Sequence, residues 1–146
     1  MAFLQGFGPE GDFLRDRFDT LWVSGPQSAP RTPVAWSNTR FTPPDNASWV
    51  RFSIHHFPEG EIASFGSAGS NLRRVDGTII VEMFAPMNVG EGALEILGDA
   101  VAAIYRDVTS QDGLRFGEPS TTNVGPQGGW YKRDVLVPFV RDTVFT

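Results

Sequence analysis

The sequence of 146 residues contains no cysteine and only two histidines. The absence of cysteine excludes disulfides, thiol nucleophiles and zinc–thiolate sites. His55 and His56 are adjacent, and neighbours on a strand point to opposite faces, so they cannot chelate one metal ion together. No third ligand is suggested nearby, and no Gly-x-Ser-x-Gly motif is present. The sequence therefore predicts neither a metal site nor a Ser-His-Asp triad.

Positive charge is also scarce. The chain has 12 lysines and arginines against 17 aspartates and glutamates, a net charge of −5, and the acidic excess lies in residues 75–146. A protein that grips nucleic acid needs the opposite sign. All basic residues except Lys132 are arginines, and arginine suits ion pairs at interfaces better than lysine does. The charge balance disfavours nucleic-acid binding, and the preference for arginine favours assembly with other protein chains.

Long apolar runs are missing as well. No run approaches the roughly 20 residues that span a bilayer, and the first residues lack the basic and apolar regions of a signal peptide, so we expect no contact with a membrane. The length of 146 residues and the hydrophobic content of 40% fit one globular domain. We expect a flexible N-terminus over residues 1–8 and a single domain over residues 9–146.

Apolar residues at helical spacing predict two helices. The first runs from about Pro9 to Trp22, and the second from Gly90 or Glu91 to about Asp107. Alternating and β-branched segments predict short extended pieces or strands at Val34–Trp36, Arg40–Phe41, Trp49–Phe57, Thr78–Ala85, Leu114–Phe116, Thr121–Val124 and Trp130–Val140. Turns join successive strands, which favours an α+β fold: a single layer of mostly antiparallel sheet packed with two helices.

The segment NVGEGA lies between a predicted strand and the second helix, where many nucleotide sites begin. A phosphate loop needs free backbone N–H groups and usually a following lysine. Here Glu91 and Glu95 would repel phosphate, and they complement the positive end of the helix dipole instead. The sequence predicts a structural turn, no cofactor and no enzymatic activity.

The predicted strands leave a long loop at residues 58–74, rich in small residues. A stretch of this length inside a compact domain is usually functional or disordered. We expect it to be disordered in the free monomer and ordered by neighbouring chains. Apolar and basic side chains make it a candidate assembly-interface loop: Ile62, Phe65, Leu72, Arg73 and Arg74. The two arginines are candidates for pairing with acids of a neighbouring subunit or of a partner protein.

Three segments together carry a resemblance to a known family. They are TPVAWSNTRFTPPDNASWVRFSI, GTIIVEMFAPMNVGEGALEILGDAVAAIY and GGWYKRDVLVPFV. Their order and spacing over residues 9–142 resemble the tail terminator proteins of long-tailed bacteriophages and of related gene transfer agents. The motifs do not distinguish a phage from a gene transfer agent.

The resemblance implies an α+β fold and a structural role in a virion. It implies a homohexameric ring that caps the tail tube, ends tube polymerisation and joins the tail to the filled head. The expected partners are the major tail tube protein and a head-completion or stopper protein, and DNA passes through the lumen without specific binding. The expected location is the head–tail junction, after assembly in the cytoplasm of the bacterial host.

Two alternatives stay open at this stage. One is another head–tail connector component, such as a stopper or tail-completion protein with a similar small fold. The other is a small ligand-binding or enzymatic α+β domain, which a pocket with converging polar groups would favour.

An acidic stripe on the second predicted helix is the last candidate surface. Glu91, Glu95 and Asp99 lie one helical turn apart. Burying three unpaired carboxylates would cost several kcal/mol. We therefore expect the stripe to face either the lumen of a ring or the outer solvent.

Overall fold

The computed structural model describes residues 6–23, 32–57, 62–63, 71–106, 108 and 113–145. It contains helices α1 (Phe7–Val23) and α2 (Gly92–Arg106). The strands are β1 (Val34–Trp36), β2 (Trp49–His56), β3 (Ile62–Ala63), β4 (Asn71–Pro86), β5 (Leu114–Phe116), β6 (Ser120–Gln127) and β7 (Trp130–Phe145). Among the described residues, no helix is long and apolar enough to cross a membrane.

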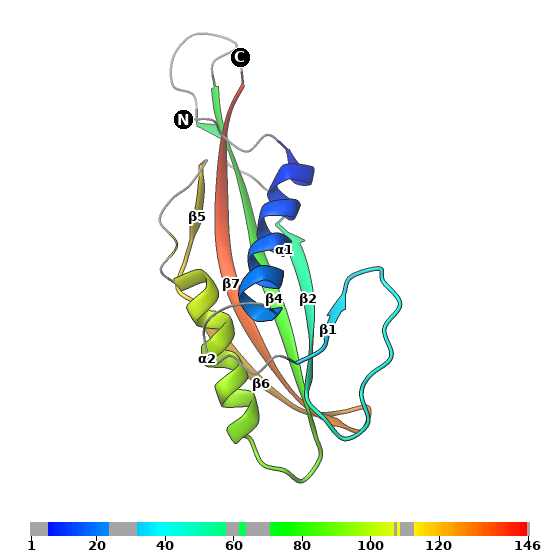
Figure 1. Cartoon of the computed structure of the whole chain (residues 1–146). Coiled ribbons are helices and arrows are strands. Elements are labelled where there is room, and N and C mark those ends of the chain that lie inside the picture. Colours follow the sequence, from blue (N-terminus) through cyan, green and yellow to red (C-terminus); the bar gives the residue numbers. More distant parts are fainter. Residues whose placement is uncertain are drawn as a thin grey trace.

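The seven strands form one sheet in the order β1-β2-β4-β7-β5 (Figure 1). β3 pairs with β4, and β6 pairs with β7. Only β1 and β2 are parallel, and every other pair is antiparallel. The two central strands pair over their whole length, from Asn71 opposite Phe145 to Pro86 opposite Trp130. The predicted α+β fold, a mostly antiparallel sheet with two helices, is confirmed.

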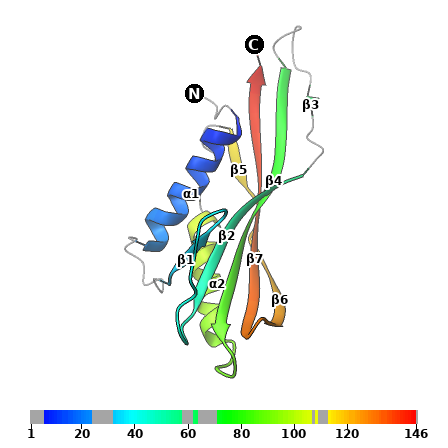
Figure 2. The same cartoon turned by 90° about the vertical axis from the view of Figure 1, so that its right-hand side faces the viewer.

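Both helices pack against the same face of the sheet, and no helix covers the other face in the described part of the chain (Figure 2). The predicted apolar stripes of the helices point inward: Leu14, Phe18 and Trp22 from α1 are buried, as are Leu94, Leu97 and Val101 from α2. Alternate residues of the central strands complete this core: Ile79, Val81, Met83, Val135, Val137 and Phe139.

Gly77 lets an aromatic ring lie across the middle of the sheet. It pairs with Phe139 in the neighbouring strand. A Cβ atom at Gly77 would lie 2.5 Å from Cζ of Phe139 and 2.7 Å from the carbonyl oxygen of His55. Only a residue without a side chain fits under the ring, and the ring in turn lies edge-on to His56, with centroids 6.0 Å apart.

The central strands are longer than the sequence predicts. β4 begins at Asn71 rather than Thr78, and β7 ends at Phe145 rather than Val140. The predicted loop at residues 58–74 is therefore wrong at its C-terminal end, and it also contains β3. The added parts of β4 and β7 contain charged residues and lack the alternating pattern of a strand. They are nevertheless strands, because they pair with each other. Phe7 and Gly8 belong to α1 rather than to the predicted flexible terminus, and residues 1–5 lie outside the described part.

Candidate assembly surfaces

An aromatic cluster occupies one end of the uncovered sheet face. The rings of Trp49 and Phe84 stack with centroids 4.0 Å apart and planes 7° from parallel. Phe41 lies 5.1 Å and Trp130 5.8 Å from Trp49. Trp49 and Phe84 are buried, although neither α1 nor α2 covers them. The cluster gives this face a small apolar core of its own.

A charged cluster adjoins these rings. Lys132 Nζ lies 2.7 Å from Glu82 Oε2 and 3.5 Å from Asp134 Oδ1, and Arg51 approaches Glu82 at 3.8 Å. Burial lowers the pKa of the Lys132 ammonium, but its hydrogen bond with Glu82 and the charges of Glu82 and Asp134 outweigh burial, so the net shift is upward. Burial raises the pKa of Asp134, and the Lys132 charge offsets this only in part. Glu82 is therefore the main partner of Lys132.

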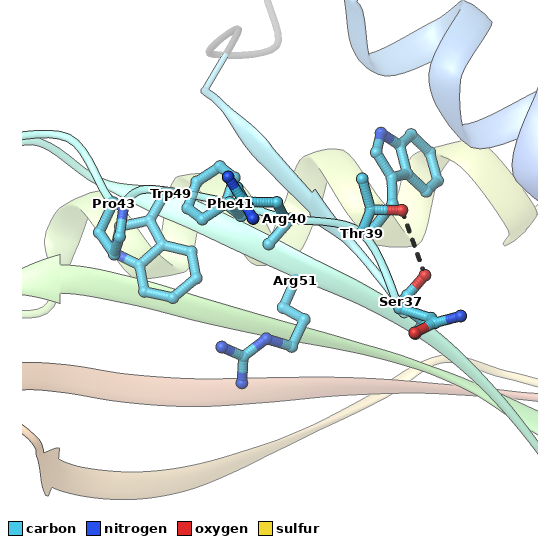
Figure 3. Close-up of a pocket in the computed structure, with 10 residues that line it drawn as sticks. Ser37, Thr39, Arg40, Phe41, Pro43, Trp49 and Arg51 are labelled. Atoms are coloured by element: carbon cyan, nitrogen blue, oxygen red, sulfur yellow. Dashed lines mark hydrogen bonds between the residues drawn. The ribbon is translucent and has the colours of Figure 1, made fainter.

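A groove of about 620 Å³ lies beside β1 and continues from the aromatic cluster. Figure 3 shows Arg40, Phe41, Trp49 and Arg51 along it, with Thr39 donating a hydrogen bond of 3.4 Å to the carbonyl oxygen of Ser37. We call this surface the arginine groove. Arg40 is exposed and forms no ion pair with any described residue. The indole Nε1 of Trp49 is buried and has no hydrogen-bond partner within the described structure.

The predicted acidic stripe divides into two parts. Glu91 precedes α2, and its Oε1 accepts hydrogen bonds from Asn123 Nδ2 at 3.1 Å and from the Tyr131 hydroxyl at 3.2 Å. Arg133 approaches the same oxygen at 3.8 Å. Glu91 therefore holds the start of α2 against β6 and β7, and it does not act as a free surface charge.

Glu95 and Asp99 form the other part. Both are exposed, and neither pairs with a cation among the described residues. They line a cleft of about 260 Å³ between α2 and the start of β6, together with Arg106 and Arg133. We call this surface the acidic cleft. Arg106 is paired with Glu118 at 3.1 Å, and the Nε of Arg133 is buried without a hydrogen-bond partner in the described part.

The residues of the candidate assembly-interface loop lie at the far end of the sheet. Ile62 pairs with Arg73, and Leu72 lies between Ala63 and Val144. Arg74 donates to Asp142 at 2.8 and 3.2 Å, and Asp142 also accepts a hydrogen bond from Arg115 at 3.0 Å. The charge of Arg74 is thus compensated within the chain by Asp142, and its pairing with a neighbouring subunit or the tube stays a prediction. Phe65 lies outside the described residues.

A buried ionic cluster was not predicted from the sequence. Glu10 is fully buried in α1; its Oε1 accepts a hydrogen bond from Arg141 at 2.8 Å, and its Oε2 lies 2.6 Å from His56 Nε2. Helical spacing contains a signal, because Glu10 stands one turn before Leu14 on the buried stripe. The partner Arg141 could not be inferred, since it is distant in sequence. Glu10 joins α1 to strands β2 and β7.

Comparison with known proteins identifies the family. A family model described as "Phage tail terminator protein" matches residues 12–138, and the chain belongs to this family. A solved protein chain shares the fold, with a TM-score of 0.60 and 18% sequence identity over 93% of this chain and 97% of the other. No curated protein sequence matches the chain. The protein is therefore a structural component of a phage tail that contacts other tail or head proteins.

Proposed function

We propose that the protein forms a ring on the end of the tail tube, ends tube polymerisation there and joins the tail to the head. Family membership supports a role in the tail, and the sequence resemblance implies a homohexamer at the head–tail junction, assembled in the host cytoplasm. The proposed partners are the major tail tube protein and a head-completion or stopper protein.

One observation favours a closed ring: the two lateral edges of the sheet differ. β1 forms one edge, β5 and β6 form the other, and each has a single neighbouring strand in the described sheet. A ring joins one surface of each subunit to a different surface of the next, whereas a two-fold dimer needs a self-complementary surface. Two dissimilar edges on opposite sides suit the ring.

The proposed ring needs no catalysis, and it lets DNA pass through the lumen without specific binding. A net charge of −5 gives the subunit little attraction for phosphate. β4 and β7 form a long two-stranded ribbon, and β3 pairs with β4 at the end where Asn71 lies opposite Phe145. This end of the ribbon, with Ile62 in β3 and Leu72 in β4, remains a proposed contact with a neighbouring subunit or with the tube.

The test uses the major tail tube protein of the same particle. Its subunits polymerise into tubes with and without the protein, and electron microscopy measures the lengths and the ends of the tubes. We expect a ring on one end of each tube and no further growth from that end. Asp16→Asn, a change at an exposed position of α1, serves as the control and should cap tubes normally. Binding to heads but never to tubes would favour a stopper protein instead.

A further inference from the structure

We propose that the ring contact joins the acidic cleft of one subunit to the arginine groove of a second copy of this chain. The inference rests on the proposed function, because a ring is what brings two copies together in this way. In the contact, Glu95 and Asp99 of one copy face Arg40 of the next.

The two surfaces lie on opposite sides of the molecule. The arginine groove borders β1, at one edge of the sheet, and the acidic cleft lies between α2 and β6, towards the other edge. Figure 1 shows β1 on the right and α2 on the left of the central strands. Each copy in a ring must offer two different surfaces facing opposite neighbours, and these two meet that requirement.

The charges that remain unpaired within the described chain are complementary. Arg106 and Arg133 line the acidic cleft, but each already has an acidic neighbour, Glu118 and Glu91 respectively. Glu95 and Asp99 have none among the described residues. Across the molecule, Arg40 is exposed and equally without an ion pair in the described part. A planar guanidinium suits carboxylate partners at an interface.

Exposed apolar surface is also available beside the acidic cleft. Ile96 follows Glu95 on α2, and its side chain is 59% exposed. In the arginine groove, Phe41 is half-buried against Trp49. The proposed contact buries Ile96 of one copy against Phe41 and Trp49 of the next, and the charged residues surround this apolar centre. An apolar centre with a polar rim is the usual composition of a protein interface. DNA is a poor occupant of the cleft, because its phosphates would meet two carboxylates.

The experiment exchanges charge across the proposed contact. The variants are Arg40→Glu, Asp99→Arg and the double variant, with Asp16→Arg on α1 as the matched control. Ring yield is measured by native mass spectrometry, and tube capping by electron microscopy. Each single variant should lower ring yield about tenfold or more, because like charges then face each other at every contact. The control should behave as wild type, and all variants should keep the wild-type melting temperature.

Mixing the two single variants gives the sharpest result. Each contact between unlike variants then pairs two opposite charges: the native Asp99 with the native Arg40, or the two introduced residues with each other. An equimolar mixture should recover ring yield to within about threefold of wild type, as should the double variant. The mixed ring must alternate, so it contains an even number of subunits, and its mass should show equal amounts of both variants.

The possible failures are distinguishable. If wild-type protein caps tubes and both single variants cap them equally well, the ring contact is overturned while the proposed function stands. If the single variants form rings but pass DNA poorly, Glu95 and Asp99 lie in the lumen, and this result also overturns the proposed ring contact. If wild-type protein forms rings but never caps tubes, the proposed function fails, and the mixing result still decides the ring contact.

Discussion

Arg141 donates its Nε–H to Oε1 of Glu10 across 2.8 Å, and the two residues are only 3% and 0% exposed. The pair joins the first turns of α1 to the end of β7. Phe7 lies 5.5 Å from the Arg141 guanidinium, and its ring centroid is 4.8 Å from that of His56. The N-terminal end of α1 is thus fixed by a buried charge rather than by apolar contacts alone.

Glu10→Gln should destabilise the fold strongly. It removes the negative charge that faces Arg141 and His56, and breaking a buried ion pair from one side costs about 3–5 kcal/mol. Urea unfolding followed by tryptophan fluorescence measures the loss. The control is Asp12→Asn, at an exposed position of α1 two residues after Glu10. It should change stability by less than about 0.5 kcal/mol. Equal stabilities of the two variants would refute the role assigned to Glu10.

Gly77→Ala should also destabilise the protein, by about 1–3 kcal/mol. The added methyl group would collide with the Phe139 ring and with the His55 carbonyl oxygen, which lies 2.7 Å from the position of the new Cβ. The backbone carbonyl belongs to a paired strand and has little room to shift. Gly92→Ala is the matched control, since nothing lies within 4 Å of a Cβ at that position and alanine favours a helix. A neutral Gly77→Ala would contradict the packing described here.

The sequence predicts features that depend on neighbouring residues and misses those that depend on distant ones. The apolar stripe of α2 and the alternation of β2 are local patterns, and both elements were found close to their predicted bounds. The extensions of β4 and β7 become strands only through pairing between Asn71 and Phe145. The same limit applies to the candidate surfaces: no local pattern links Glu91 to Asn123 or Arg74 to Asp142.

Stability should fall as pH rises above about 10. Glu82 and Asp134 overcome the effect of burial and raise the pKa of Lys132 above its ordinary 10.5, and burial raises the pKa of the Tyr105 phenol above its ordinary 10.0. The folded protein therefore keeps protons that the unfolded chain loses, and the difference in bound protons lowers stability with rising pH. The stability that Lys132 and Tyr105 contribute is complete at pH values below their ordinary pKa values. It is lost as the pH rises from the ordinary pKa values towards the higher pKa values of the folded protein.

Urea unfolding between pH 8 and pH 11 measures this slope. Tyr105→Phe should make the slope shallower, although it also removes the hydrogen bond of 2.9 Å to the Leu14 carbonyl oxygen and so lowers stability at pH 8. Lys132 is the only lysine in the chain, so methylation gives one side-chain resonance, which NMR distinguishes from that of the N-terminal amine because the amine titrates near about 8. A midpoint below 10.5 would contradict the dominance of Glu82 over burial.

The end of the β4–β7 ribbon should matter for assembly more than for folding. The double variant Ile62→Asp, Leu72→Asp introduces charge where we propose contact with a neighbouring chain. We expect tube capping to fall at least about tenfold, because an unpaired charge in an interface costs several kcal/mol. Ile62→Ala, Leu72→Ala is the control for size. An aspartate variant that caps tubes normally would remove this end from the interface.

Glu91 and Glu95 should respond differently to the same substitution. Glu91 accepts hydrogen bonds from Asn123 and Tyr131, so Glu91→Ala removes two hydrogen bonds and should cost about 1–3 kcal/mol, at about 0.5–1.5 kcal/mol for each bond. Glu95 is exposed in the first turn of α2, where a carboxylate contributes only about 0.3–1 kcal/mol through the helix dipole. Chemical denaturation of the two variants at the same salt concentration gives the comparison. Two equal losses would mean that the acidic residues act as one solvated stripe, whereas a larger loss at Glu91 leaves Glu95 and Asp99 as the part available to a neighbouring subunit.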